Sequence, residues 1–134
     1  MRLALLWASL GLAGQPSKLP DDDRRAARLW AESCVGCHGA RGLGDGPLSA
    51  ALGVRPIAGR PFAGEADVAL LRVGAGRMPG FGDLLDAGDA ARVLSWLSRL
   101  DPATGLLAGE SAEDAAAPPP PEGEGAEEDG EGGG

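Results

Sequence analysis

Both cysteines of the chain and its single histidine lie within five consecutive residues, in the sequence Cys-Val-Gly-Cys-His at residues 34–38. Two thiols three positions apart are thus followed at once by an imidazole, and the remaining 129 positions hold no further Cys or His. A disulfide framework is excluded, because two cysteines form at most one bridge. The fold of this chain therefore has to accommodate the chemistry of residues 34–38.

Three kinds of site use thiols at this spacing. A Cys-x-x-Cys redox pair needs a βαβ context, and no stretch of the sequence alternates as a strand. A zinc site needs a fourth ligand, for which the chain has no further Cys or His. The pattern Cys-x-x-Cys-His is the attachment signature of c-type haem, in which the thiols add to the vinyl groups and the imidazole binds iron. We therefore expect Cys34, Cys37 and His38 to hold one covalent haem c.

The composition also favours a bound prosthetic group. The 134 residues include 23 glycines and 11 prolines, only 4% are aromatic, and there is no tyrosine. A domain this small with so few large apolar side chains needs a cross-link or a bound group to be stable. We expect the chain without haem to be at most partly folded.

Charge and hydropathy divide the chain into four parts. Residues 1–14 join a short positive start to an apolar run and small residues, which predicts a signal peptide that is too short to span a bilayer. Residues 15–20 form a linker, and residues 21–104 form the domain. Residues 105–134 contain nine acids and no base, so we expect a disordered acidic tail rich in Gly and Pro. The net charge of −8 argues against nucleic acid as a partner.

The domain is predicted to be all-α, with three to five helices and loops. Its first helix begins at three aspartates, residues 21–23, which favour a helix N-terminus, and continues as one apolar face. Its last helix begins at Asp86 as the capping residue and ends before Pro102. Weaker helical signals cover residues 48–52 and 65–73.

The second axial ligand of the iron follows by elimination. His38 is the only histidine, and after removal of the signal peptide Met78 is the only methionine. A thioether is a usual partner for histidine in cytochromes. Pro79 favours an extended backbone at Met78, and the flanking Gly76 and Gly80 allow close approach to a ring. The alternative is a sixth position that is open or filled by water.

With these motifs in this order, the chain resembles the class I mono-haem cytochromes c. It is most similar to small bacterial domains that serve as periplasmic carriers or as haem subunits of terminal oxidases. The resemblance covers residues 21–104 and implies a small cytochrome c fold in which the N- and C-terminal helices cross. Ala26, where the family often has Gly, would face Trp96, and Trp30 matches a position that is usually aromatic.

The resemblance also implies contacts around the haem. Pro47 matches the proline whose carbonyl accepts a hydrogen bond from the ligand histidine, with a simple turn proline as the alternative. Arg55 and Arg60 are candidates to pair with the haem propionates, unless they are solvated loop arginines. Arg41 and Arg77 are expected near the exposed edge of the haem.

These features predict a protein that transfers single electrons and is not an enzyme, because an iron with both axial positions filled has no site for a substrate. We expect a monomeric periplasmic carrier without a membrane span, whose partners are redox proteins. The alternative is a haem-bearing subunit or docking module of a periplasmic dehydrogenase or terminal oxidase. A peroxidase or a gas sensor would need an open or displaceable sixth position. The acidic tail either modulates docking electrostatically or only solvates the protein.

Overall fold

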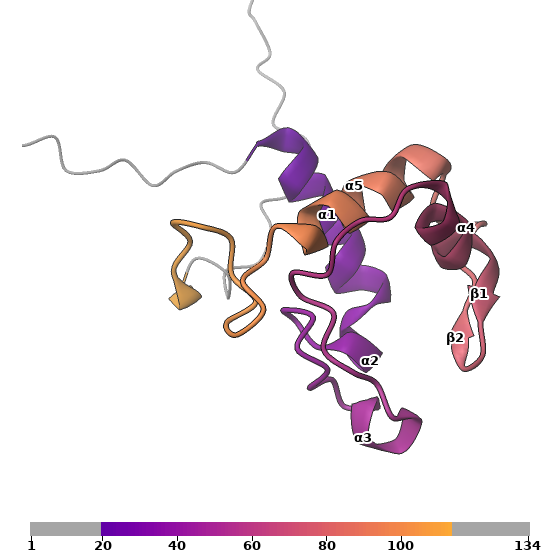
Figure 1. Ribbon diagram of the computed structural model, residues 1–134, viewed down its shortest axis with the longest axis horizontal. Helices are drawn as coiled ribbons and strands as arrows, with labels where there is room; N and C mark the ends of the chain where they lie inside the picture. Colours follow the sequence, from indigo (N-terminus) through magenta and orange to yellow (C-terminus); the bar gives the residue numbers. More distant parts are fainter. Residues whose placement is uncertain (1–19, 114–134) are drawn as a thin grey trace, which may run out of the picture.

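The computed structural model describes residues 20–113. The predicted signal peptide, most of the predicted linker and residues 114–134 of the acidic tail lie outside these residues. The described chain forms five helices and one small antiparallel sheet of two strands (Figure 1), so the all-α class is confirmed. None of the helices between residues 20 and 113 has the length and apolar character needed to cross a membrane.

Four of the five helices lie where the sequence predicts them, and the short helix over residues 35–38 was not predicted. The elements in chain order are α1 (Asp21–Ser33), α2 (Val35–His38), α3 (Ser49–Leu52), α4 (Glu65–Val73), β1 (Gly74–Ala75), β2 (Met78–Pro79) and α5 (Ala87–Ser98). The weak signals at residues 48–52 and 65–73 correspond to α3 and α4. The hairpin of β1 and β2 was not predicted, because strands of two residues are too short to show alternation.

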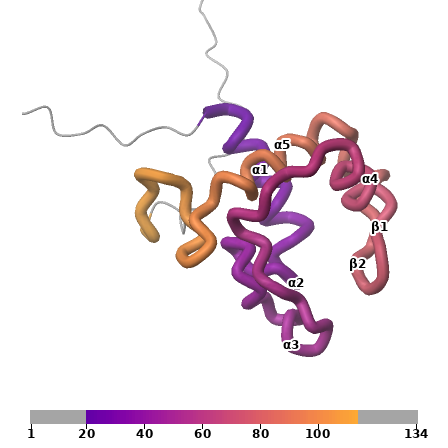
Figure 2. The backbone as a smooth tube through the Cα atoms, in the orientation of Figure 1, coloured from indigo at the N-terminus to yellow at the C-terminus, as the bar shows by residue number. Residues whose placement is uncertain are grey.

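The N- and C-terminal helices of the domain cross, as the resemblance implies (Figures 1 and 2). Ala26 of α1 is wholly buried, and it shares one core cluster with Trp30 of the same helix and Trp96 of α5. The two indole rings lie 5.8 Å apart between centroids and are tilted by 53°. A small side chain at Ala26 thus leaves room for aromatic packing between the helices.

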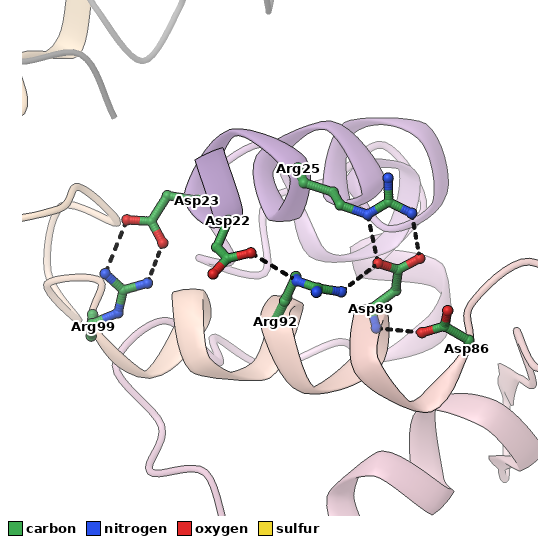
Figure 3. Close-up of polar contacts among 7 residues, drawn as sticks. All are labelled: Asp22, Asp23, Arg25, Asp86, Asp89, Arg92 and Arg99. Atoms are coloured by element: carbon green, nitrogen blue, oxygen red, sulfur yellow. Dashed lines mark hydrogen bonds and ion pairs between the residues drawn. The ribbon is translucent and has the colours of Figure 1, made fainter. Parts of the chain in front are cut away.

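A carboxylate of α5 binds two arginines where α1 and α5 meet (Figure 3). Asp89 is buried and accepts hydrogen bonds from Arg25 Nε at 2.6 Å, from Arg25 Nη2 at 2.8 Å and from Arg92 Nη1 at 3.1 Å. The hydrogen bond from Arg25 is the main cause of the lowered pKa of Asp89. The backbone N–H of Asp89 donates to the Asp86 carboxylate at 2.7 Å, which confirms Asp86 as the capping residue of α5.

Two of the three first-turn aspartates of α1 also bind arginines at α5, although the sequence suggested only that they favour a helix N-terminus. Asp22 accepts from Arg92 Nε at 2.9 Å, and the buried Asp23 accepts from both terminal nitrogens of Arg99. The residue that precedes α1 is Pro20, and no side chain caps this helix. These aspartates therefore hold the two crossing helices together as well as favouring the start of α1.

Ordered structure continues beyond the predicted end of the domain at residue 104. The Asp101 N–H donates to the Leu106 carbonyl at 2.8 Å, and Leu107 packs against the core between α1 and α5. Gly105, at φ +65°, lies directly against the backbone of Arg41, whose guanidinium donates to the Ala112 carbonyl at 3.4 Å. Leu107 thus packs on apolar surface that the sequence pattern does not reveal, and the predicted boundary between domain and tail stays a prediction.

Candidate functional site

The thiols and the imidazole of the motif lie on a helical turn that continues α1. Cys34 follows the last residue of α1, and its N–H donates to the Trp30 carbonyl at 2.9 Å. The N–H of His38 in turn donates to the Cys34 carbonyl at 2.9 Å. Because the backbone is helical both before and after Cys34, this residue lies close to Cys37 and His38. The two cysteines are free thiols in this structure, and Cys34 is buried.

Trp30 supports this turn from within the core. Its ring centroid lies 5.7 Å from that of His38, at an interplanar angle of 42°. Its indole Nε1–H donates to the carbonyl of Gly39, immediately after the motif, at 3.0 Å. The aromatic residue four positions before Cys34 therefore holds both the ring of His38 and the end of α2.

Met78 reaches the same region from the other side of the molecule, on the β1–β2 hairpin. Ala75 pairs with Met78, and Gly74 pairs with Pro79. Gly74 has φ +82°, and a Cβ there would lie 2.6 Å from the carbonyl oxygen of Met78, so this turn from α4 into β1 requires glycine. The Phe81 N–H then donates to the Leu71 carbonyl of α4 at 2.9 Å. The hairpin is thereby held against α4 on both sides of Met78.

Two cavities, of about 440 Å³ and about 110 Å³, lie between the motif and the hairpin. Both are lined by Cys34, His38, Ile57 and Met78, and the larger one also by Cys37. The larger volume falls in the range of roughly 300–1,000 Å³ that ligand sites span. The larger cavity thus brings together all four residues that the sequence predicts for attachment and ligation, from the junction of α1 and α2, from α2 and from β2.

The charge states of the site follow from its burial. Burial lowers the pKa of His38, so the imidazole is neutral, which is the form that binds a metal. Its Nδ1 is buried and has no hydrogen-bond partner among residues 20–113. Burial and the neighbouring Cys37 raise the pKa of Cys34 to about 11. Within the described chain, no three side chains of His, Cys, Asp or Glu converge as they would in a zinc site.

Three exposed arginines surround these cavities. Arg55 and Arg77 line the larger cavity, and Arg60 lines the smaller one. Arg77 Nη1 donates to the carbonyl of Ala51 at 3.3 Å. Arg41 lines neither cavity, and its expected position near the haem edge stays a prediction.

Residues 21–97 match the model of a protein family described as cytochrome C oxidase, cbb3-type, subunit III. The chain belongs to this family. Comparisons with curated proteins and with solved structures gave no match. Family membership confirms the resemblance to class I cytochromes c, the covalently bound haem c with its iron, and haem-based electron transfer.

The residues of this cytochrome c domain fit the haem. A thioether and a neutral imidazole, whose buried Nδ1 has no partner among residues 20–113, face one cavity, and both thiols line its wall. Trp30, Ile57 and Leu97 line the smaller cavity, so apolar side chains complete the enclosure. A haem is a large apolar ring with one metal, and this donor set in an apolar slot is the environment it requires.

The structure does not show the hydrogen bond that the family resemblance implies between His38 and Pro47. Pro47 is exposed, and among the described residues His38 Nδ1 has no acceptor. The loop is held instead at Gly36 of α2, whose carbonyl accepts from the N–H of Leu48 at 3.0 Å. A Cβ on Gly46 would lie 2.6 Å from the carbonyl oxygen of Val35, so the loop already lies as close to α2 as its backbone permits.

Sequence reasoning missed the apolar walls that come from the middle of the chain. Ile57, Phe62 and Leu70 line the smaller cavity, although none of them belongs to a motif. Leu70 is on α4, and its position in the weak helical pattern of residues 65–73 was the one sequence feature that indicated burial. The loop residues carried no such signal.

Proposed function

We propose that this cytochrome c domain is a periplasmic one-electron carrier with one haem, bound through Cys34 and Cys37 and ligated by His38 and Met78. The observation that carries the proposal is the position of these four side chains around one cavity. The single Cys-x-x-Cys-His motif supports one haem. The apolar stretch that begins the sequence supports export, and c-type haem is attached after export in bacteria.

When bound, the haem iron supplies one-electron oxidation and reduction. The chain sets the conditions for this chemistry. His38 offers a neutral nitrogen and Met78 a thioether, a pair that favours a relatively high reduction potential. His38 lies on α2 and Met78 on β2, so a bound iron would be ligated by two elements of the chain and would offer no position to a substrate.

The arginines at the cavities suit the carboxylates of the haem. Arg55 and Arg60 are proposed to pair with the propionates, because each lines one of the two cavities and a guanidinium binds a carboxylate through two hydrogen bonds. Pro47 remains a proposed acceptor for His38 when the haem is in place, and Nδ1 is the nitrogen that would donate to it.

The family supports a second form of this function. Its description names a subunit of an oxidase, which favours a haem-bearing electron-transfer subunit over a free monomeric carrier. One measurement distinguishes a free carrier from an oxidase subunit. A carrier elutes alone when extracts of the native cells are fractionated without detergent, whereas a subunit co-purifies with oxidase polypeptides and stoichiometric haem.

Met78→Ala tests the ligand assignment. The variant should have a lower reduction potential and should bind carbon monoxide in the reduced state, because the sixth position is opened. Ala75→Ser is the matched control, since Ala75 pairs with Met78 in the hairpin and its side chain is exposed. An unchanged spectrum and potential in Met78→Ala, or the same change in both variants, would refute His/Met ligation.

A further inference from the structure

The β1–β2 hairpin, which carries Met78, is bound to the domain through its backbone at one end. Its second strand is followed by Phe81 and Gly82, whose N–H groups donate to carbonyls in the last turn of α4, each at 2.9 Å. In the described part of the chain, no backbone hydrogen bond joins the hairpin to α2 or α3. In Figure 1 the hairpin points away from α4 and toward the end of the molecule that holds α3. Backbone hydrogen bonds therefore fix the base of the hairpin, and its tip depends on side chains.

The tip of the hairpin is the turn formed by Gly76 and Arg77. A Cβ on Gly76 would have no atom within 4 Å, so this side of the turn faces open space. The side chain of Arg77 reaches α3, where Nη1 donates to the carbonyl of Ala51 at 3.3 Å. Both residues are exposed, and they lie 26 positions apart in the sequence. A side-chain hydrogen bond thus connects the tip of the hairpin to α3.

The helix α3 is itself bound to α2, the helix that carries His38. The N–H of Leu48, the residue before α3, donates to the Gly36 carbonyl of α2 at 3.0 Å. The loop before α3 also lies as close to α2 as its backbone permits. A hydrogen bond from Arg77 to α3 therefore links the hairpin of Met78 to the helix of His38.

The larger cavity is bordered by both of these elements. Its lining includes residues 52–55, at the end of α3 and after it, and residues 77–79 of the hairpin. Movement of the hairpin tip away from α3 would widen this cavity and carry Met78 with it. Such movement would first break the hydrogen bond between Arg77 and Ala51.

This hydrogen bond is compatible with a bound haem. A guanidinium carries five N–H donors and stays charged in proteins, and Arg77 donates only from Nη1 to Ala51. Arg55 and Arg60 are the proposed partners of the propionates. Because the acceptor is a neutral carbonyl, the contact requires a donor in the right place and no net positive charge at the cavities.

We propose that Arg77 is a positioning residue that holds Met78 at the iron, because its hydrogen bond to Ala51 keeps the tip of the hairpin against α3. The inference rests on the proposed ligation by Met78. With the hydrogen bond in place, the hairpin is held at its base by α4 and at its tip by α3. Without it, the hairpin pivots about its backbone bonds to α4, and an external ligand replaces the thioether more often.

Cyanide binding to the oxidised full-length holoprotein measures how often Met78 leaves the iron. Arg77→Leu removes every donor but keeps an apolar stem, and it should speed cyanide binding roughly two- to fivefold, as expected for the loss of one exposed hydrogen bond. Arg77→Lys keeps charged donors on a long stem, so it should bind cyanide more slowly than Arg77→Leu. Equal rates in these two variants, or a wild-type rate in Arg77→Leu, would overturn the proposal.

Arg72→Leu is the matched control. Arg72 is an exposed arginine of α4 near the base of the hairpin, and it lines a separate surface groove with Glu65 and Asp83 but neither haem cavity. This variant should bind cyanide at the wild-type rate, and an acceleration equal to that of Arg77→Leu would overturn the proposal. So would an acceleration in Arg77→Leu at about 10 mM salt that disappears at about 1 M, because salt screens charges and leaves a bond to a neutral carbonyl in place.

Amide hydrogen exchange gives a second readout that does not depend on cyanide. Exchange at the backbone N–H groups of residues 74–79 should be faster in Arg77→Leu than in the wild type, because the tip of the hairpin is released. It should be unchanged in Arg72→Leu. Exchange rates that are the same in all three proteins would overturn the hydrogen bond as a restraint on the hairpin.

The double variant Met78→Ala/Arg77→Leu separates this inference from the proposed function. Because Arg77 acts through Met78, the double variant should bind cyanide no faster than Met78→Ala alone. A further acceleration in the double variant would overturn the positioning role and leave ligation by Met78 intact. A wild-type cyanide rate in Met78→Ala itself would instead overturn the ligation, and the positioning role with it.

Discussion

Asp89→Asn would measure how much the ion pairs between α1 and α5 stabilise the domain. The substitution keeps the size of the side chain and the backbone hydrogen bond to Asp86, but it removes the charge that Arg25 and Arg92 bind. A hydrogen bond to a charged group contributes about 1.5–3 kcal/mol. The asparagine oxygen still accepts, and the arginine side chains are 51% and 41% exposed and can be hydrated. We therefore expect a loss of about 2 kcal/mol in the free energy of unfolding, near the low end for one such bond.

Asp21→Asn is the matched control for this effect. Asp21 also lies in the first turn of a helix, so both substitutions lose a similar interaction with the helix dipole. Its carboxylate is 90% exposed and pairs with Arg24 of the same helix, so the ion pair should contribute about 0–1 kcal/mol. For a domain of about 100 residues, 2 kcal/mol corresponds to a decrease of about 8–16 °C in Tm.

Urea unfolding of the holoproteins, followed by circular dichroism at pH 7 and at lower pH, measures the difference. The pKa of Asp89 is lowered in the folded state, chiefly by the hydrogen bond from Arg25. Its stabilisation is therefore complete above the unfolded pKa of about 3.9 and is lost as the pH falls through the lowered folded pKa. The gap between wild type and Asp89→Asn should thus close below about pH 4. A gap at pH 7 no larger than that of Asp21→Asn, or one that persists unchanged in acid, would refute the reasoning.

Two further substitutions test the haem attachment and the hairpin. The double variant Cys34→Ser/Cys37→Ser should contain no covalent haem and should lose most of its helical circular dichroism, and a haem-free variant with native-like helicity would contradict this account of stability. Gly74→Ala places a Cβ at φ +82° against the backbone of residues 78–80, so it should loosen Met78 and speed cyanide binding to the oxidised protein. Gly76→Ala, also at positive φ but with no atom within 4 Å of the new Cβ, should have a smaller effect, and equal cyanide rates would exclude a role of Gly74 in holding Met78.

Local signals in the sequence determined the helices and the haem motif. Thiols at i and i+3 followed by an imidazole are adjacent in the chain, and the helix signals at residues 21–33 and 86–98 depend on neighbours within a few turns. Met78 was found by elimination, because the composition leaves no other thioether after residue 20. Such features can be predicted from the sequence because the interactions behind them span few residues or involve residue types that occur once.

Tertiary structure alone decided which distant groups meet. Asp22 and Asp23 favour a helix N-terminus in the sequence, yet their guanidinium partners lie 70 and 76 residues away, on α5 and directly after it. Packing against the α1–α5 core likewise ordered Leu107 beyond the predicted end of the domain. Pairing over such separations depends on where the folded backbone places each side chain, and no local pattern encodes that position.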